Sequence, residues 1–217
     1  MLAHLIKYSH RSLNTLTFHQ NMSDCYIIGN GGHARVVSDI LDYNGHDRIL
    51  GFYDDFPPSV SSQNYQGKVE NINTHVICAI GNCQVRKRIV QENPQAIWHE
   101  ALIHNRAYIS GNARVGKGTV VCVDAIIQTH CQIGDHVIIN TGASVDHDCQ
   151  IADFVHIAPG AVLCGNVRIG EGTFIGAGSV IRENITIGSN VIIGCGSVVV
   201  SNIPDNCTAY GNPCRIK

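Results

Sequence analysis

The residues best suited to chemistry lie in one short stretch, S-V-D-H-D-C at residues 144–149. His147 is a natural general base, because the unperturbed pKa of imidazole lies near neutral pH. Asp148 follows it and could orient the ring or support the imidazolium. Such a pair can take a proton from an amine or a hydroxyl while that group attacks an acyl carbon. The alternative explanation is a histidine in an ordinary surface turn.

A second candidate site is the glycine-rich turn G-N-G-G-H at residues 29–33. It follows a predicted strand and opens a predicted helix, where backbone N–H groups suit a phosphate or pyrophosphate. Its pattern G-x-G-x-x-A is a weak dinucleotide fingerprint, and the surrounding unit is too short for a full two-half dinucleotide fold. Asp54 and Asp55 end the next strand, where a carboxylate could bind a ribose or a base. A tight turn needed only for packing is the alternative.

The His147 stretch lies within a six-residue repeat. Apolar residues recur every six positions, without a slip, from Ile103 to Val199, and small or β-branched residues recur four positions after each of them. A hexad is too short for a helix that buries a face but long enough for one short strand and a turn. Stacked coils of such strands would fill a narrow interior with the two apolar columns. We therefore expect a β-helix with capped ends.

The glycine-rich turn lies in an N-terminal unit of a different kind. Apolar runs predict short strands and helical spacing predicts two helices, which together make a small Rossmann-like β-α-β unit. The predicted strands are Cys25–Gly29, Ile49–Tyr53, Val76–Ile80 and Ile97-Trp98; the predicted helices are Ala34–Asn44 and Cys83–Glu92; and 59–66 is expected to be a loop. We divide the chain into an extension at 1–21, this unit at 22–100, and a β-helix with a C-terminal cap at 101–217.

Composition excludes several classes of protein. The formal net charge of −2 gives no electrostatic argument for nucleic acid as a partner. No apolar stretch approaches the roughly 20 residues that a membrane span needs, and residues 1–21 lack the unbroken apolar core of a signal peptide. The ten cysteines form no C-x-x-C pair. Cys131 and Cys149 fall in the inward column, so we expect buried thiols and a reducing cytoplasm.

Five motifs in order carry a family resemblance. They are I-I-G-N-G-G-H-A at 27–34, F-Y-D-D at 52–55, A-I-G-N at 79–82, S-V-D-H-D-C at 144–149 and G-N-P-C-R at 211–215. Together with the hexads they make residues 24–217 resemble the NeuD/PglD-like hexapeptide sugar O-/N-acetyltransferases of sialic-acid and bacillosamine pathways. The resemblance implies a left-handed parallel β-helix, with three hexads in each coil of 18 residues. It also implies a homotrimer with the acyl-donor groove between neighbouring β-helices.

The resemblance also implies roles for individual residues. His147 matches the general base, and Asp148 matches its supporting acid, which is often Glu in relatives. The positions that match acetyl-CoA-binding residues are His156, Gly165, Ala177 and Cys195, the last being a loose match because relatives tend to have Gly. Those that match the sugar-acceptor site are Gly29, Gly31, Gly32, His33, Asp54, Asp55, Gly81, Asn82 and Asn140.

The implied activity is acetyl transfer from acetyl-CoA, a co-substrate, to an amino group of a nucleotide-linked amino sugar, in cell-surface glycan biosynthesis. No bound cofactor or metal is expected, and direct transfer is preferred over a Cys149 nucleophile. One alternative is O-acetylation of a sialic-acid-like sugar. A second is hydration by zinc, as in γ-class carbonic anhydrases, because His130, His136, His147 and His156 cluster in sequence. A third is a non-catalytic sensor of a sugar nucleotide.

The coil length predicts which residues are neighbours. Residues 18 apart should stack on adjacent coils, so Gly165 should lie beside His147 and leave room for a thioester. By the same spacing His130 should lie beside Asp148. We expect a contact between His130 and Asp148 that tunes the His147–Asp148 pair, against the alternative of two solvated side chains.

Overall fold

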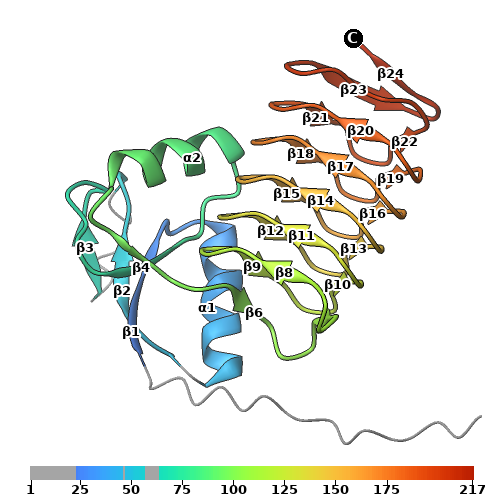
Figure 1. Ribbon diagram of the computed structural model, residues 1–217. Helices are drawn as coiled ribbons and strands as arrows, with labels where there is room; N and C mark the ends of the chain where they lie inside the picture. The colour runs from blue at the N-terminus through green and yellow to red at the C-terminus, as the bar shows by residue number, and fades with distance from the viewer. Residues whose placement is uncertain (1–22, 46, 57–63) are drawn as a thin grey trace, which may run out of the picture.

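The N-terminal part of the chain is a parallel α/β unit (Figure 1). The computed structural model describes residues 23–45, 47–56 and 64–217, so the expected extension at 1–21 lies outside it. Five strands lie in the order β3-β2-β1-β4-β5: β1 (Ser23–Ile28), β2 (Asp47–Tyr53), β3 (Tyr65–Gly67), β4 (His75–Cys78) and β5 (Ile97–Trp98). The two helices are α1 (Gly32–Asn44) and α2 (Cys83–Glu92).

The predicted elements of this unit are confirmed, apart from one strand. The loop expected at 59–66 is partly wrong, because Tyr65–Gly67 forms β3; residues 57–63 lie outside the described residues. β3 pairs with β2, and the ring of Tyr65 lies 5.6 Å from that of Phe52. Such a three-residue edge strand is held by its neighbour rather than by an apolar pattern of its own, so its sequence gives no strand signal.

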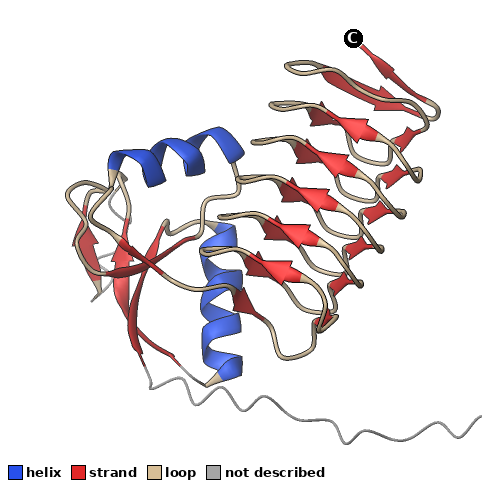
Figure 2. Cartoon of the chain, in the orientation of Figure 1, coloured by secondary structure: helices blue, strands red, loops and turns tan. Residues whose placement is uncertain are grey.

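The rest of the chain winds as a parallel β-helix with three sheets (Figure 2). We name each sheet by what lies on its outer side: helix α2, apolar side chains or polar side chains. The α2 face contains β6 (Leu102–Ile103), β9 (Val120–Val121), β12 (Ile138–Ile139), β15 (His156–Ile157), β18 (Phe174–Ile175), β21 (Ile192–Ile193), β23 (Thr208–Gly211) and β24 (Cys214–Ile216). The apolar face contains β7 (Tyr108–Ile109), β10 (Ile126–Ile127), β13 (Ser144–Val145), β16 (Val162–Leu163), β19 (Val180–Ile181) and β22 (Val198–Val199). The polar face contains β8 (Arg114–Val115), β11 (Gln132–Ile133), β14 (Gln150–Ile151), β17 (Arg168–Ile169) and β20 (Thr186–Ile187).

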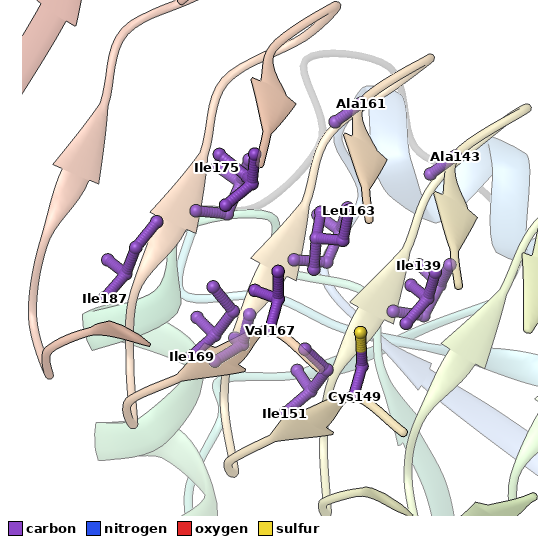
Figure 3. Close-up of a cluster of buried hydrophobic side chains, with 14 of the residues drawn as sticks. Ile139, Ala143, Cys149, Ile151, Ala161, Leu163, Val167, Ile169, Ile175 and Ile187 are labelled. Atoms are coloured by element: carbon purple, nitrogen blue, oxygen red, sulfur yellow. The ribbon is translucent and has the colours of Figure 1, made fainter. Parts of the chain in front are cut away.

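Both predicted columns point into the β-helix, and Figure 3 shows how they fill it. Ile157, Leu163 and Ile175 from the first column and Ala161 and Cys149 from the second are completely buried. The strands pair at a spacing of 18 residues, as in Gln132 with Gln150. Each coil therefore buries the apolar side chains of the next, which explains why the repeat tolerates no slip.

The N-terminal unit packs on the α2 face. Val37 and Leu41 of α1 share a buried cluster with Leu102 and Val120 of the first coils. At the opposite end, the antiparallel pair β23–β24 places Ala209 in the same core as the last coils. Neither helix in the described part of the chain is long and apolar enough to cross a membrane.

Candidate active site

The His147 edge is the row of turns that joins the apolar face to the polar face, and it carries the predicted base. His147 lies between β13 and β14, with its side chain 55% exposed. Its Nδ1 lies 2.7 Å from Oδ2 of Asp148, and its backbone N–H donates to Asp146. The hydrogen bond with Asp148, followed by the charge of Asp146, raises the pKa of His147. Because Nδ1–H donates to the carboxylate, Nε2 is free to accept a proton.

Gly165 lies directly beside this imidazole, as predicted from the coil length. A Cβ placed at position 165 would lie 2.6 Å from Nε2 of His147. Any side chain there would displace the ring. Within the described residues the N–H of Gly165 donates to no acceptor. It can therefore donate to an oxygen that develops negative charge near Nε2.

The predicted contact between His130 and Asp148 is wrong. The described residues contain no hydrogen bond or ion pair that joins these two side chains, and Asp148 pairs with His147 instead. Both residues have backbone φ near 60°, at 61° and 62°. They occupy the same left-handed turn position on successive coils, as do Asn166 and Asn184 further along, whose side chains are joined by a hydrogen bond of 2.8 Å.

A second polar cluster lies on the α2 face, around His156. Nδ1 of His156 lies 2.9 Å from the carbonyl oxygen of Gly81, and Nε2 lies 3.1 Å from Nδ2 of Asn140. A carbonyl accepts only and an amide nitrogen donates only, so His156 is neutral with its proton on Nδ1. Burial lowers the pKa of His156 to about 4, and burial also lowers that of His33 to about 4. The two rings lie 6.4 Å apart, and Nε2 of His33 is buried without a partner within the described residues.

A cleft of about 520 Å³ opens between the start of α2 and the α2 face. Its floor is made by His156, Phe174 and Ile192, which lie on successive coils, and one wall is the segment 81–84. The ring of Phe174 meets that of His156 edge-on at 5.1 Å. The cleft combines an apolar floor with a few polar groups, which is typical of small-molecule sites.

The structure does not bring His147 and His156 together within one chain. The turn that carries His147 joins the apolar face to the polar face, whereas His156 lies on the third sheet. In a three-sided coil this turn is opposite that sheet. Ala177 and Cys195 lie in the turns that follow β18 and β21, at the edge shared by the α2 face and the apolar face. The acetyl-CoA residues implied by the resemblance are therefore divided between two edges.

Most of the predicted acceptor residues lie at the carboxyl ends of β1 and β4; Asp54 and Asp55 follow β2, and Asn140 follows β12 of the β-helix. The sheet order places β1 and β4 side by side, with their crossovers running in opposite directions, which is where ligands bind in open α/β sheets. The glycine-rich turn follows β1, and the segment 79–82 follows β4. Gly29 has φ +106°, and a Cβ there would lie 2.7 Å from Ile80. Position 29 therefore requires glycine, because φ is positive and Ile80 leaves no room for a Cβ.

Asp54 and Asp55 have structural partners. One carboxylate oxygen of Asp54 accepts from the N–H of Asn30, and the other accepts from that of Phe56. Asp55 accepts from the N–H of Val69. Asp54 thereby ties the end of β2 to the glycine-rich turn. Their role as substrate ligands stays a prediction.

The four histidines considered for zinc have separate surroundings. His136 is buried between the rings of Trp98 and Phe154, at centroid distances of 5.0 and 5.4 Å. His156 lies in the cleft and His147 lies on the opposite edge. The described residues contain no group of three or more metal-binding side chains.

Two features of the site were not predicted from the sequence. Arg86 of α2 is 1% exposed and contacts the segment 80–81. The sequence predicts a helix at Cys83–Glu92 but does not single out this residue. Cys83 lines the cleft, where its Sγ lies 3.7 Å from the carbonyl oxygen of Thr173. The only available signal for Arg86 was its place between Cys83 and Ile89 on the apolar side of the helix.

A hexapeptide β-helix with an exposed His–Asp pair and a cleft with an apolar floor is typical of a hexapeptide acyltransferase. Comparison with known proteins agrees: residues 24–93 match the PglD N-terminal domain, and 130–165 and 166–201 match the bacterial transferase hexapeptide. The acetyltransferase domain of PglB from Neisseria gonorrhoeae is 38% identical, with a TM-score of 0.84 over 89% of this chain and 99% of that one. It is also known in complex with acetyl coenzyme A.

A mutant of perosamine N-acetyltransferase from Caulobacter crescentus, in complex with CoA and GDP-perosamine, is 33% identical, with a TM-score of 0.84 over 89% of this chain and 96% of that one. An uncharacterized protein of Acanthamoeba polyphaga mimivirus is 36% identical over 105 residues, and the chain spans 20% of its length. The chain belongs to the PglD-type family of acetyl-CoA-dependent sugar N-acetyltransferases.

Proposed function

We propose that the protein transfers the acetyl group of acetyl-CoA to an amino group of a nucleotide-linked amino sugar. The observation that carries this proposal is the His147–Asp148 pair, whose free Nε2 lies beside Gly165. Full-length similarity to an acetyltransferase domain crystallised with acetyl-CoA supports the donor. Similarity to an enzyme crystallised with GDP-perosamine supports an amine on a nucleotide-linked sugar as the acceptor.

The chemistry is a direct transfer. Nε2 of His147 takes a proton from the amine as its nitrogen attacks the thioester carbon, and the Gly165 N–H stabilises the oxygen of the intermediate. The carbon–sulfur bond then breaks, and the proton on His147 passes to the sulfur of CoA. Cys149 is unsuited as a nucleophile, because it is completely buried and its hydrogen bond with Cys131, followed by burial, raises the pKa of its thiol.

We propose that the complete site forms between two copies of the chain. His147 and Gly165 lie on the His147 edge, whereas His156 and the cleft lie on the opposite α2 face. One acetyl group can reach both only if the His147 edge of one copy meets the α2 face of the next. Such a contact joins two different patches, so copies form a ring when the rotation between them closes. A homotrimer, as the resemblance implies, satisfies this geometry.

The apolar face supports contact between copies. Four of its outward side chains, Tyr108, Ile126, Val162 and Val180, are large, apolar and 37–56% exposed. The equivalent column of the polar face consists of Arg114, Gln132, Gln150, Arg168 and Thr186. A row of exposed apolar residues, interrupted in this column by Ser144, is typical of an interaction surface.

The N-terminal unit is the proposed binding site for the nucleotide-linked sugar. Gly31, which precedes α1, provides no side-chain cap, so the first N–H groups of the helix are available to a phosphate. His33, Gly81 and Asn82 lie at the junction of β1 and β4, on the side of the cleft. We place the reaction in the cytoplasm, because all ten cysteines are unpaired.

The test is a thiol-release assay with acetyl-CoA and a panel of amino sugars linked to GDP, UDP and dTDP, together with free sialic acids. We expect CoA release with at least one nucleotide-linked amino sugar, and an amide product by mass spectrometry. An ester formed with a sialic acid would favour O-acetylation instead. Tight binding of a sugar nucleotide without consumption of acetyl-CoA would favour a sensor and contradict the proposal.

A further inference from the structure

Arg86 is a buried cation that donates to five backbone carbonyls and also lies within hydrogen-bond reach of the Cys83 side chain. Its Nε donates to His136, at 2.8 Å; Nη2 donates to Phe154 and Val155, at 2.8 and 3.2 Å; and Nη1 donates to Ile80 and Gly81, at 2.7 and 3.2 Å. Arginine has five N–H donors, and all five are used. None of the ion pairs among the described residues includes Arg86.

These five bonds join three parts of the molecule. The carbonyls of His136 and of Phe154 and Val155 belong to turns on two successive coils of the β-helix, whereas Ile80 and Gly81 belong to the segment after β4. The guanidinium therefore fixes this segment relative to the β-helix. Lysine could not reproduce the arrangement, because its ammonium is a compact point with three donors.

The Gly81 carbonyl is held from two sides. Arg86 donates to it from behind, and Nδ1 of His156 donates to it from the cleft, at 2.9 Å. That bond places the proton of His156 on Nδ1, so that Nε2 can accept from Asn140. Asn140 thus donates to His156, His156 donates to the Gly81 carbonyl, and Arg86 donates to the same carbonyl, so that fixing this carbonyl orients the His156 ring.

We propose that Arg86 is a positioning residue for acetyl transfer: by fixing the Gly81 carbonyl it sets the tautomer and orientation of His156 in the cleft. This inference rests on the proposed function, because it assumes that the cleft is part of the acetyl-transfer site. The effect of Arg86 on the tautomer of His156 can be measured without turnover. Arg86 lies behind the segment 80–81 and contacts no substrate.

The electrostatics agree with this arrangement. Burial lowers the pKa of His156, the hydrogen bond to Gly81 opposes that effect, and the charge of Arg86 adds to it. His33 is affected in the same direction by burial, by His156 and by Arg86. Burial, to which the fixed positive charge behind the cleft adds, thus keeps the two imidazoles neutral at physiological pH.

The first experiment uses the unmodified protein. ¹⁵N spectra of a histidine-labelled sample, with His156 assigned by comparison with His156→Asn, report which ring nitrogen carries the proton. We expect the proton on Nδ1 across pH 6–8. A proton on Nε2, or an imidazolium in this range, would overturn the proposal whether or not any Arg86 variant folds.

The second experiment compares two variants of α2. Arg86→Lys removes the five-donor geometry, whereas Lys87→Met removes a different link between α2 and the β-helix, the 3.0 Å ion pair of Lys87 with Glu171. We expect Arg86→Lys to lower kcat by about 10- to 100-fold, as for a small misplacement of a reacting group, and to change the His156 spectrum. Lys87→Met should change neither.

A purely structural role for Arg86 gives a different pattern. Both variants would then lower only the melting temperature, with kcat and the His156 tautomer preserved, and the proposal would be wrong. Guanidinium added to Arg86→Ala should restore part of kcat without changing KM for acetyl-CoA. If the unmodified protein acetylates no sugar but His156 carries its proton on Nδ1 and responds to Arg86→Lys, the proposed function fails and the positioning role stands.

Discussion

We infer that His147 acts as a base through Nε2, the nitrogen that Asp148 leaves free. Its exposed position gives the substrate access, and Gly165 provides the space beside Nε2. The position of Gly165 beside His147 was predicted correctly from the sequence, because residues 18 apart stack in this fold. The prediction failed for His130, because the carboxylate of Asp148 pairs with His147 within its own turn rather than with a side chain of the preceding coil.

Gly165→Ala tests the space beside the base. The added methyl group would force the imidazole away from Asp148, so we expect kcat/KM to fall by at least about 10-fold, with the fold retained. Gly111→Ala is the matched control. Gly111 occupies the same turn position three coils earlier, and a Cβ there would have no atom within 4 Å. Equal effects of the two substitutions on steady-state kinetics would contradict this account.

Asp148→Asn tests the origin of the raised pKa. A carboxylate beside the ring stabilises the imidazolium, so its removal should lower the pKa of His147. Activity requires the neutral base, and the acidic limb of the kcat/KM–pH profile should therefore move to lower pH. Asp146→Asn should move it the same way by less. A limb that stays in place, or moves to higher pH, would show that Asp148 does not set this pKa.

At the scale of elements, the hexads define a scaffold in which each strand contributes one inward residue. Their period predicted both buried columns and the buried thiols of Cys131 and Cys149. It could not predict β3 or Arg86. A short edge strand and a buried cation depend on partners far along the chain, and neither leaves a periodic trace in the sequence.

Leu163→Ala tests the contribution of one inward residue. Leu163 is completely buried in β16, so the substitution should lower the free energy of unfolding by about 2–5 kcal/mol. Denaturant unfolding measures this change. Gln150→Ala, on the outward side of β14, should change it by less than about 0.5 kcal/mol. Comparable losses for the two would mean that the interior is not close-packed at this coil.

At the scale of the whole molecule, the three faces have different tasks: one carries the N-terminal unit, one is apolar and one is polar. His147 and His156 lie on opposite sides of a coil. Their spacing of nine residues is half of an 18-residue coil. The sequence therefore already indicated that the two side chains lie on opposite sides, although the family resemblance placed both near one acetyl group. The resemblance implied the roles of the two histidines. The three-sheet geometry shows that they lie too far apart in a single chain to contact one acetyl group.

Mixing two inactive variants tests a site shared between copies. His147→Ala and His156→Ala should each be inactive alone. When co-expressed they should regain about a quarter of normal activity, because one in four interfaces then pairs an intact His147 with an intact His156. Sedimentation of the mixture confirms co-assembly. A co-assembled mixture that is no more active than its parts would place the whole site within one chain.

The central claim is that His147 takes the proton of an amino sugar as that sugar is acetylated. The most direct measurement is amide formation from acetyl-CoA and the best nucleotide-linked amino sugar of the panel, by the wild-type protein and by His147→Ala, at pH 7.5 and in matched oligomeric states. The account predicts a rate for the variant about 10²- to 10⁴-fold lower, with the affinity for acetyl-CoA little changed. Equal rates of amide formation would contradict it.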